Sequence, residues 1–563
     1  MGTDLFAYRR APELLTGQPG RYPVIVIGAG PIGLCAAIDL ALHGVDCVLM
    51  DEEATLSEGS RAICFSKRTL EVLDRLGCAE RALAKGVVWN LGKVYLRDKL
   101  LYSFDLLPEL GHKYPAFINL QQYFLEQFLV ERLLEIGRVD ARWRNRVVDV
   151  QPHADHVLVE VETPDGRYVA RAEYVIAADG ARSSVRRILG LEAQGQTFRD
   201  RFLIADVKME ADFPTERWFW FDPPFHPQQS ALLHRQADNV WRIDFQLGWD
   251  ANPEEEREPL RVIARIETML GPERPFTLEW VSVYTFQCRR MEKFRHGRVI
   301  FTGDAAHQVS PFGARGANGG IHDVDNLTWK LVRVLAGKAP ESLLDTYDME
   351  RVPAADENIL NSTRSTDFIT PKSRASRMFR DAALQLAEHL PFARRLVNSG
   401  RLSTPHTYTR TPLSTPDQDA FAGRATPGAP ADDAPLTTGD EPAWLLDQLG
   451  GRFVGIYFAG AESANPNLRS RLNALVNLPE PVDPLVICGL GQSGGWRALG
   501  LDAFDDVQGL FAQRYDASPD AFYLIRPDQH IAARWRHLDV RAARDAVQRA
   551  TGHLAPEFAA WQA

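Results

Sequence analysis

The chain has 563 residues, of which 45% are hydrophobic and 25% are charged, and its formal net charge is −10. This length predicts two to four packed units, and the composition is that of an ordinary globular protein. The arginines are scattered and the pI is near 5.8, so we expect no basic surface for a phosphate backbone. These features argue against a nucleic-acid partner.

The six cysteines lack the CxxC spacing of metal and dithiol sites. We therefore expect no metal centre, and thiols buried in a reducing compartment. No stretch reaches the roughly 18 apolar residues that cross a bilayer. Residues 1–20 also lack the apolar core of a signal peptide, so a cytoplasmic protein without a membrane partner is predicted.

The first recognisable element is a strand–turn–helix–strand pattern near the N-terminus. An apolar run at residues 23–27 leads into Gly28, Gly30 and Gly33, which open a helical pattern, and a second apolar run ends at Asp51. The glycines of such a βαβ unit permit a tight turn and close approach of a pyrophosphate, and the carboxylate binds a ribose hydroxyl. This combination predicts a dinucleotide site; the alternative is a glycine-rich turn with a structural role only.

Two later motifs also follow apolar strands. Residues 174–186 run from a strand pattern into Asp179, and residues 298–307 run into Asp304. A glycine-rich segment at residues 311–320 then leads into apolar residues spaced as on one face of a helix. The positive end of that helix could stabilise negative charge on a bound group, although a loop in front of a buried helix explains the pattern equally well.

The expression GxGxxG occurs again at residues 489–494. No carboxylate stands at the distance that separates Gly28 from Asp51, since Ala512 occupies that position. We interpret this second occurrence as a turn rather than a cofactor site.

Taken together, in this order and at this separation, the motifs at Gly28, Asp179 and Asp304 resemble those of the class A FAD-dependent aromatic hydroxylases, which include p-hydroxybenzoate and phenol hydroxylases. The resemblance covers residues 22–353, and the C-terminal part resembles the thioredoxin-like tail of the phenol-hydroxylase branch. It implies an α/β fold, with a Rossmann-like FAD-binding domain, an inserted β-rich substrate domain and a C-terminal thioredoxin-like α/β domain. Because the tail has no CxxC, a packing or homodimer role is favoured over dithiol exchange.

Composition and pattern suggest where these units begin and end. Aromatic and polar residues alternate in the middle of the chain, as in a half-buried sheet, and a later stretch rich in Pro, Gly, Asp and Thr is typical of a linker. The predicted units are residues 1–200 (first part of the FAD-binding domain, with an N-terminal extension at 1–20), 201–286 (β-rich substrate domain), 287–403 (second part of the FAD-binding domain, with helices), 404–442 (linker) and 443–563 (C-terminal domain).

The resemblance also implies resident FAD and a transient NADH or NADPH, since the sequence offers one credible dinucleotide fingerprint. Two positions depart from the commonest family pattern: Glu52 follows the ribose acid, and Ala314-Arg315 replaces Gly-Gln. The residues implied for cofactor binding are Gly28, Gly30, Gly33, Asp51, Arg61, Gln122, Asp179, Asp304, Gly316, Ala317 and Asn318, with Pro311 lining the isoalloxazine at the reaction centre.

The implied reaction is hydroxylation of a phenolic or polycyclic aromatic substrate by dioxygen through a flavin C4a-hydroperoxide. The protein must then exclude water and provide a base for the phenol proton. Tyr284 and His234 are the candidates for that base. Trp218 and Trp220 are the candidates for substrate contacts, with Phe219 as a further candidate for the pocket wall; a buried structural role is the alternative for each of these residues.

Two further functions stay open at this point. The same scaffold could oxidise a fused-ring or polyketide aromatic compound, or cleave a ring, and product analysis would separate these reactions from simple hydroxylation. A flavin-bound redox sensor is the non-enzymatic alternative, and it would not couple NAD(P)H oxidation to a phenol.

Overall fold

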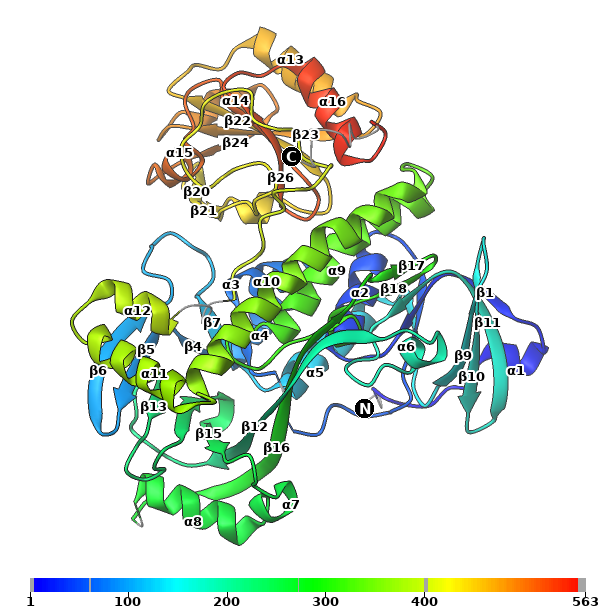
Figure 1. Ribbon diagram of the computed structural model, residues 1–563. Helices are drawn as coiled ribbons and strands as arrows, with labels where there is room; N and C mark the ends of the chain where they lie inside the picture. Colours follow the sequence, from blue (N-terminus) through cyan, green and yellow to red (C-terminus); the bar gives the residue numbers. More distant parts are fainter. Residues whose placement is uncertain (1–4, 60–61, 272, 399–402, 555–563) are drawn as a thin grey trace.

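The structure is a computed structural model that describes residues 5–59, 62–271, 273–398 and 403–554. Within these residues the strands form three large sheets and one small sheet (Figure 1). The small sheet joins β3 (Cys64–Ser66), β7 (Phe117–Asn119) and β4 (Val87–Trp89). No helix in the described part of the chain is long and apolar enough to cross a membrane.

The first large sheet forms the core of the nucleotide-binding unit. β1 (Gly20–Ile27) pairs in parallel with β2 (Cys47–Met50) and with β11 (Gly166–Ala177), and α2 (Pro31–Leu42) follows β1 directly. The last four residues of β1 are buried, as expected for a central parallel strand. The expected βαβ opening is therefore confirmed. The other strands of this sheet are β8 (Val139–Arg142), β9 (Arg146–Pro152), β10 (Val157–Thr163), β17 (Arg295–His296) and β18 (Val299–Phe301).

The second large sheet is largely antiparallel and forms the expected β-rich unit. Its two longest strands, β12 (Ala193–Lys208) and β16 (Thr277–Met291), pair side by side and run out from the nucleotide-binding unit (Figure 1). The other strands are β19 (His307–Gln308), β15 (Val240–Leu247), β14 (Ser230–Arg235), β13 (Arg217–Phe221), β5 (Leu91–Leu96) and β6 (Lys99–Asp105).

This sheet is wider than the predicted unit at residues 201–286. The hairpin of β5 and β6 comes from residues 91–105, because β5 pairs in parallel with β13. A parallel partner more than a hundred residues away leaves no local signal at either strand. The unit also contains the short helix α7 (Pro253–Glu256) and the longer α8 (Pro259–Leu270).

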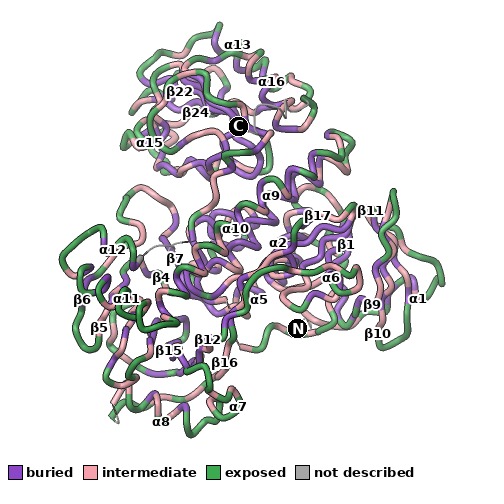
Figure 2. The backbone as a smooth tube through the Cα atoms, in the orientation of Figure 1, coloured by how far each residue is buried: buried purple, intermediate pink, exposed green. Residues whose placement is uncertain are grey.

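Long helices connect the two sheets. α9 (Gly316–Leu335) is buried along most of its length and packs against α2 (Figure 2). α10 (Asp345–Ile369) packs on α9 and reaches the β-rich unit, where α11 (Arg374–Ala387) and α12 (Pro391–Asn398) follow. The remaining helices of this part are α1 (Pro12–Thr16), α3 (Lys67–Arg75), α4 (Ala79–Lys85), α5 (Gln122–Ile136) and α6 (Ser184–Ile188).

The C-terminal unit is an α/β domain around a seven-stranded sheet. Its sheet already includes β20 (Pro435–Thr438), which lies inside the predicted linker at 404–442. The thioredoxin-like character of this unit stays a prediction. Its other elements are β21 (Glu441–Trp444), β22 (Phe453–Gly460), α13 (Pro466–Val476), β23 (Val482–Cys488), α14 (Ser493–Ala498), β24 (Asp502–Asp505), α15 (Leu510–Tyr515), β25 (Phe522–Ile525), β26 (Ile531–Trp535) and α16 (Val540–Ala550).

Candidate active site

The glycine turn after β1 is packed too tightly for any side chain at two positions. Gly28 adopts φ +100°, and a Cβ on Gly33 would lie 1.8 Å from the carbonyl oxygen of Gly28. A Cβ on Gly30, in contrast, would meet no atom within 4 Å. Gly30 precedes the first turn of α2, which has no side-chain cap, so its N–H groups remain available to an anion in that open space.

Asp51 lies at the end of β2, beside this turn. One carboxylate oxygen accepts a hydrogen bond from the Ala29 N–H at 2.5 Å, and the other accepts one from the Glu53 N–H at 2.9 Å. Burial raises the pKa of Asp51, and the two backbone hydrogen bonds oppose that effect. The carboxylate is thus fixed in the place where the sequence predicts a ribose contact.

Asp179 supports the expectation of a bound cofactor most directly. Its Oδ2 accepts hydrogen bonds from the Val185 N–H at 3.0 Å and from the Ser184 hydroxyl at 3.1 Å. Its Oδ1 is buried, and no described residue donates a hydrogen bond to it. A buried acceptor costs free energy unless a donor reaches it, so a bound polar group fits this position.

The third motif brings its residues to the start of α9. A Cβ on Gly316 would lie 3.9 Å from Asp304 Oδ1, so the half-buried carboxylate lies beside the first turn, which has no side-chain cap. The side chain of Asn318 is used structurally, since its Oδ1 accepts hydrogen bonds from the Ser66 N–H and the Thr69 hydroxyl. The helix therefore starts at a fixed point, with Ala317 between Gly316 and Asn318.

Two more predicted cofactor residues belong to the segment before α3 and to α5. Gln122 accepts a hydrogen bond from the Ala62 N–H at 3.1 Å and donates one to Glu126 at 2.8 Å. Gln122 thus holds the chain at Ala62. The predicted Arg61 lies outside the described residues. Ala314, at the position where glycine is more frequent in the family, adopts φ +52°, a conformation that glycine takes without strain.

The second GxGxxG, at residues 489–494, is a turn, as predicted. The carboxylate of Asp505 accepts hydrogen bonds from the backbone N–H groups of Gln492 and Ser493, both at 2.9 Å. The N-terminus of α14 is already satisfied by an internal anion.

A cavity of about 350 Å³ lies between the Pro311–Gly313 loop, the second sheet and the helices α10 to α12. This volume is within the range of about 300–1,000 Å³ that small-molecule sites occupy. Its walls are mainly apolar, with Phe219 and Phe312 among them, and Arg217 and Arg364 supply charge. The full lining is Trp89, Phe104, Leu106, Arg217, Phe219, Phe312, Gly313, Arg364, Ser365, Phe368, Ile369, Phe379, Leu396 and Val397.

The two tryptophans predicted to contact substrate do not line this cavity. Side chains alternate along a strand, so Arg217 and Phe219 of β13 face the cavity, whereas Trp218 and Trp220 face the opposite side. There they pack against a separate hydrophobic cluster on the other face of the sheet, which contains Trp241. This geometry therefore favours a structural role for Trp218 and Trp220 in the core of the sheet over a substrate contact.

Tyr284 and His234 lie on the cavity side of the sheet but behind its lining. The Tyr284 ring is 5.7 Å from that of Phe286, which is 5.3 Å from the ring of Phe312. His234 is buried, and its ring nitrogens have no hydrogen-bond partner among the described residues. Burial, followed by the charge of Arg217, holds the pKa of His234 well below its usual value, so the imidazole is neutral near pH 7.

Sequence reasoning named Phe219 as a candidate for the pocket wall but did not single out Arg217 or Arg364. The signal for Arg217 was present in the run RWFWF, where alternation places Arg217 on the same side as Phe219 and apart from the tryptophans. Arg364 comes from α10, and no local pattern relates that helix to β13.

Comparisons with known proteins agree with this arrangement. The family model described as "FAD binding domain" matches residues 21–362, more than half of the chain. A 3-(3-hydroxy-phenyl)propionate/3-hydroxycinnamic acid hydroxylase of Mycobacterium sp. (strain KMS) is 29% identical over 538 residues, covering 90% of this chain and 87% of the relative. A probable NADH-specific resorcinol 4-hydroxylase of Rhodococcus jostii (strain RHA1) is 34% identical over 337 residues, covering 59% of this chain and 62% of the relative.

Among solved structures, the flavin-dependent monooxygenase PieE in complex with FAD and substrate is similar in fold. Its TM-score is 0.80 at 23% identity, and the match covers 95% of this chain and all of that one, 100%. The C-terminal unit thus belongs to an arrangement that a known structure shares.

Proposed function

The chain belongs to the FAD-binding-domain family, and from that premise we propose that it hydroxylates a phenolic aromatic compound that carries an anionic group. Its relatives are FAD-dependent aromatic hydroxylases, and it is likewise a FAD-dependent monooxygenase that takes an aromatic substrate and a nicotinamide reductant. The anionic group and the residues that bind it are the new part of this proposal.

The pair of arginines in the cavity carries the proposal. Neither Arg217 nor Arg364 forms an ion pair with a carboxylate of the described residues, and the Arg217 guanidinium lies 6.0 Å from the centroid of the Trp89 ring. Arg217 is half-buried and Arg364 is exposed. A half-buried guanidinium beside apolar walls, such as that of Arg217, is matched best by a carboxylate or another anion, which it can bind through two parallel hydrogen bonds. The relatives named for hydroxyphenylpropionate and hydroxycinnamic acid act on substrates of this kind.

The chain's own residues divide the remaining work. The turn at Gly28 and Gly30 and the carboxylate of Asp51 would hold the nucleotide part of FAD, and the start of α9 would stabilise negative charge at the flavin edge. FAD, when bound, supplies the two-electron chemistry that activates dioxygen. Phe219 and Phe312 would exclude water from the substrate.

The proposal is tested with pairs of substrates that differ in one charge. NAD(P)H oxidation is measured with 3-(3-hydroxyphenyl)propionate, with resorcinol, and with the methyl ester of the acid. We expect the acid to stimulate oxidation at a much lower KM than its ester. Equal KM values for acid and ester would contradict an anion site, and stimulation by polycyclic phenols alone would favour the fused-ring alternative.

The proposal also includes a co-substrate, a location, an assembly and several residue roles. Dioxygen as co-substrate is supported by the chemistry of hydroxylation, and a cytoplasmic location by six buried thiols, none of which is paired. The base candidates Tyr284 and His234, the FAD contacts of Asp304 and Asp179, and a homodimer stay proposals.

A further inference from the structure

A turn of the C-terminal unit packs against the helices of the cofactor-binding unit. The turn joins β25 to β26 and consists of residues 526–530; we call it the 526–530 turn. Its four polar residues, Arg526, Asp528, Gln529 and His530, are at most 4% exposed. Turn residues usually lie at the surface, so their burial shows that this turn is covered by other elements, here α3, α9 and α10.

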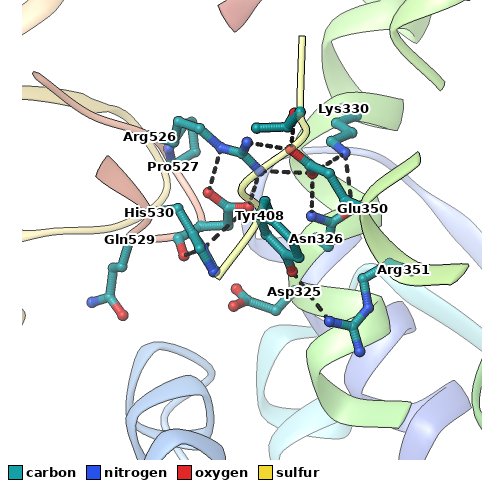
Figure 3. A network of polar contacts seen from close by, with 12 residues as sticks. Asp325, Asn326, Lys330, Glu350, Arg351, Tyr408, Arg526, Pro527, Gln529 and His530 are labelled. Carbon is teal, nitrogen blue, oxygen red and sulfur yellow. Dashed lines mark hydrogen bonds and ion pairs between the residues drawn. The ribbon is translucent and has the colours of Figure 1, made fainter. Parts of the chain in front are cut away.

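The main contact is an ion pair with α10. Arg526 donates hydrogen bonds to both carboxylate oxygens of Glu350, at 2.6 and 3.0 Å, and its other face is held by Asp528. Lys330 and Asn326 of α9 donate to the same Glu350 oxygen, at 2.7 and 2.6 Å. Figure 3 shows Arg526, Glu350, Lys330 and Asn326 converging where the turn meets the two helices.

The charges of this group balance. Arg526 and Lys330 are matched by Glu350 and Asp528, and all four lie where water cannot screen them. Loss of the guanidinium would leave a buried net negative charge, so the helices around it would have to readjust.

Arg351, the next residue of α10, connects this ion-pair group to the start of α9, where the flavin contact is predicted. Its Nε donates to Asp323 at 2.7 Å, and its other nitrogens donate to the Gly319 carbonyl at 3.1 Å and to the Tyr408 hydroxyl at 3.2 Å. Tyr408 stacks on His530 of the turn with ring centroids 4.5 Å apart. The turn therefore meets Arg351 by two routes, through Glu350 and through Tyr408 (Figure 3).

Asp323 then contacts the third motif itself. Its Oδ2 accepts a hydrogen bond from the Gly303 N–H at 3.0 Å and lies 2.6 Å from His307 Nε2. Gly303 precedes Asp304, and Gly319 lies in the first turn of α9. The two segments predicted to contact the flavin are thus held by hydrogen bonds: Gly303 by Asp323, and Gly319 by Arg351. The 526–530 turn reaches both side chains through Glu350 and Tyr408.

α3 provides a third connection between the 526–530 turn and α9. Arg68 donates to Gln529 Oε1 at 2.7 Å and to the Asp528 carbonyl at 2.8 Å, and it pairs with Asp325 of α9 at 2.9 Å. Thr69, its neighbour, donates to Asn318 in the first turn of α9.

We propose that the 526–530 turn positions the two segments predicted to contact the flavin, Gly303–Asp304 and the first turn of α9, with Arg526 as a positioning residue that acts through Glu350, Arg351 and Asp323. The C-terminal unit then supports the cofactor site, although none of its described residues belongs to the predicted site itself. The inference rests on FAD binding, which titration of the wild-type protein tests by itself.

The test compares Arg526→Met, which removes the charge at similar length, with Arg526→Lys, which keeps it. Arg452→Met is the matched control, because this arginine of the same unit pairs with Asp483 at the surface, where the two side chains are 54% and 48% exposed. The dissociation constant of FAD is measured by flavin fluorescence, and the reduction potential of bound flavin is measured alongside the thermal stability.

For Arg526→Met we expect the FAD dissociation constant to rise about 2- to 30-fold and the potential to shift, as for residues coupled to a distant site. Arg526→Lys should recover part of the loss, and Arg452→Met should match the wild type. Wild-type affinity and potential in folded Arg526→Met would overturn the proposal. Should that variant fail to fold, Tyr408→Phe decides the matter, since it removes only the hydroxyl that Arg351 contacts: weakened FAD binding supports the proposal, and wild-type binding overturns it.

Discussion

Asp323 and His307 form a buried pair in which the carboxylate oxygen and Nε2 are 2.6 Å apart. Burial opposes ionisation of Asp323, but the charges of His307 and Arg351 outweigh it and lower its pKa to about 2. The carboxylate that holds Gly303 and His307 is therefore charged in the folded protein over nearly the whole pH range.

This pair predicts an acid-dependent stability. A carboxylate with a depressed pKa stabilises the fold above its unfolded pKa of about 3.9, and the contribution is lost as pH falls toward about 2. Asp323→Asn should cost on the order of 2 kcal/mol at pH 7 and about half of that at pH 3. Urea unfolding at both pH values measures the difference. Asp356→Asn, which breaks an exposed ion pair with Arg290, is the control, and an Asp323→Asn deficit that is the same at both pH values would refute the assignment.

The glycine turn predicts opposite effects for two neighbouring substitutions. Gly33→Ala places a Cβ 1.8 Å from the Gly28 carbonyl oxygen, so it should lower the melting temperature even without FAD. Gly30→Ala meets no protein atom, so the apoprotein should melt like the wild type while FAD binding weakens. Melting of apoprotein and FAD titration separate the two, and wild-type FAD affinity in Gly30→Ala would show that the cofactor does not approach this turn.

Arg217→Met should act on substrates according to their charge. Loss of a charge-assisted hydrogen bond costs about 1.5–3 kcal/mol, so KM for an anionic substrate should rise roughly 10- to 150-fold. The KM of its neutral ester and the affinity for FAD should not change. Arg261→Met, on the exposed side of α8, is the control. A parallel loss for acid and ester would mean that Arg217 supports the cavity wall rather than an anion.

Tyr284→Phe tests the source of the phenol base. If the hydroxyl contacts the substrate oxygen, hydroxylation should slow while flavin reduction does not, and hydrogen peroxide should replace product. General-base catalysis contributes about 10²- to 10⁴-fold to the step it serves. Coupling of NAD(P)H oxidation to product is the measurement, and unchanged coupling would assign Tyr284 to the core beside Phe286.

Local motifs are enough to predict a cofactor site from the sequence, whereas the cavity lined by Arg217 and Arg364 required the fold. Gly28, Gly30 and Asp51 belong to one short βαβ pattern whose geometry is nearly fixed by its residue types. Arg217 and Arg364 come from a strand and a helix that meet only through tertiary packing. Alternation in β13 separates Phe219 from the two tryptophans, but the sequence does not tell which face borders the cavity.

The ion pair between Arg526 and Glu350 is the clearest example of a contact that the sequence does not predict. The two residues are 176 positions apart and belong to different units. A glutamate in a helix and an arginine in a turn are ordinary surface residues by pattern, and their burial follows only from the docking of the C-terminal unit.

Oxygen transfer to an aromatic ring is the central claim, and isotopically labelled dioxygen tests it most directly. The protein is incubated with FAD, NADH or NADPH and a phenolic acid, and the product mass is determined. We expect a product heavier by one oxygen atom, with the label in the new hydroxyl group and NAD(P)H consumed in step with it. Substrate-independent NAD(P)H oxidation with an unchanged phenol, or a label that comes from water, would contradict the account.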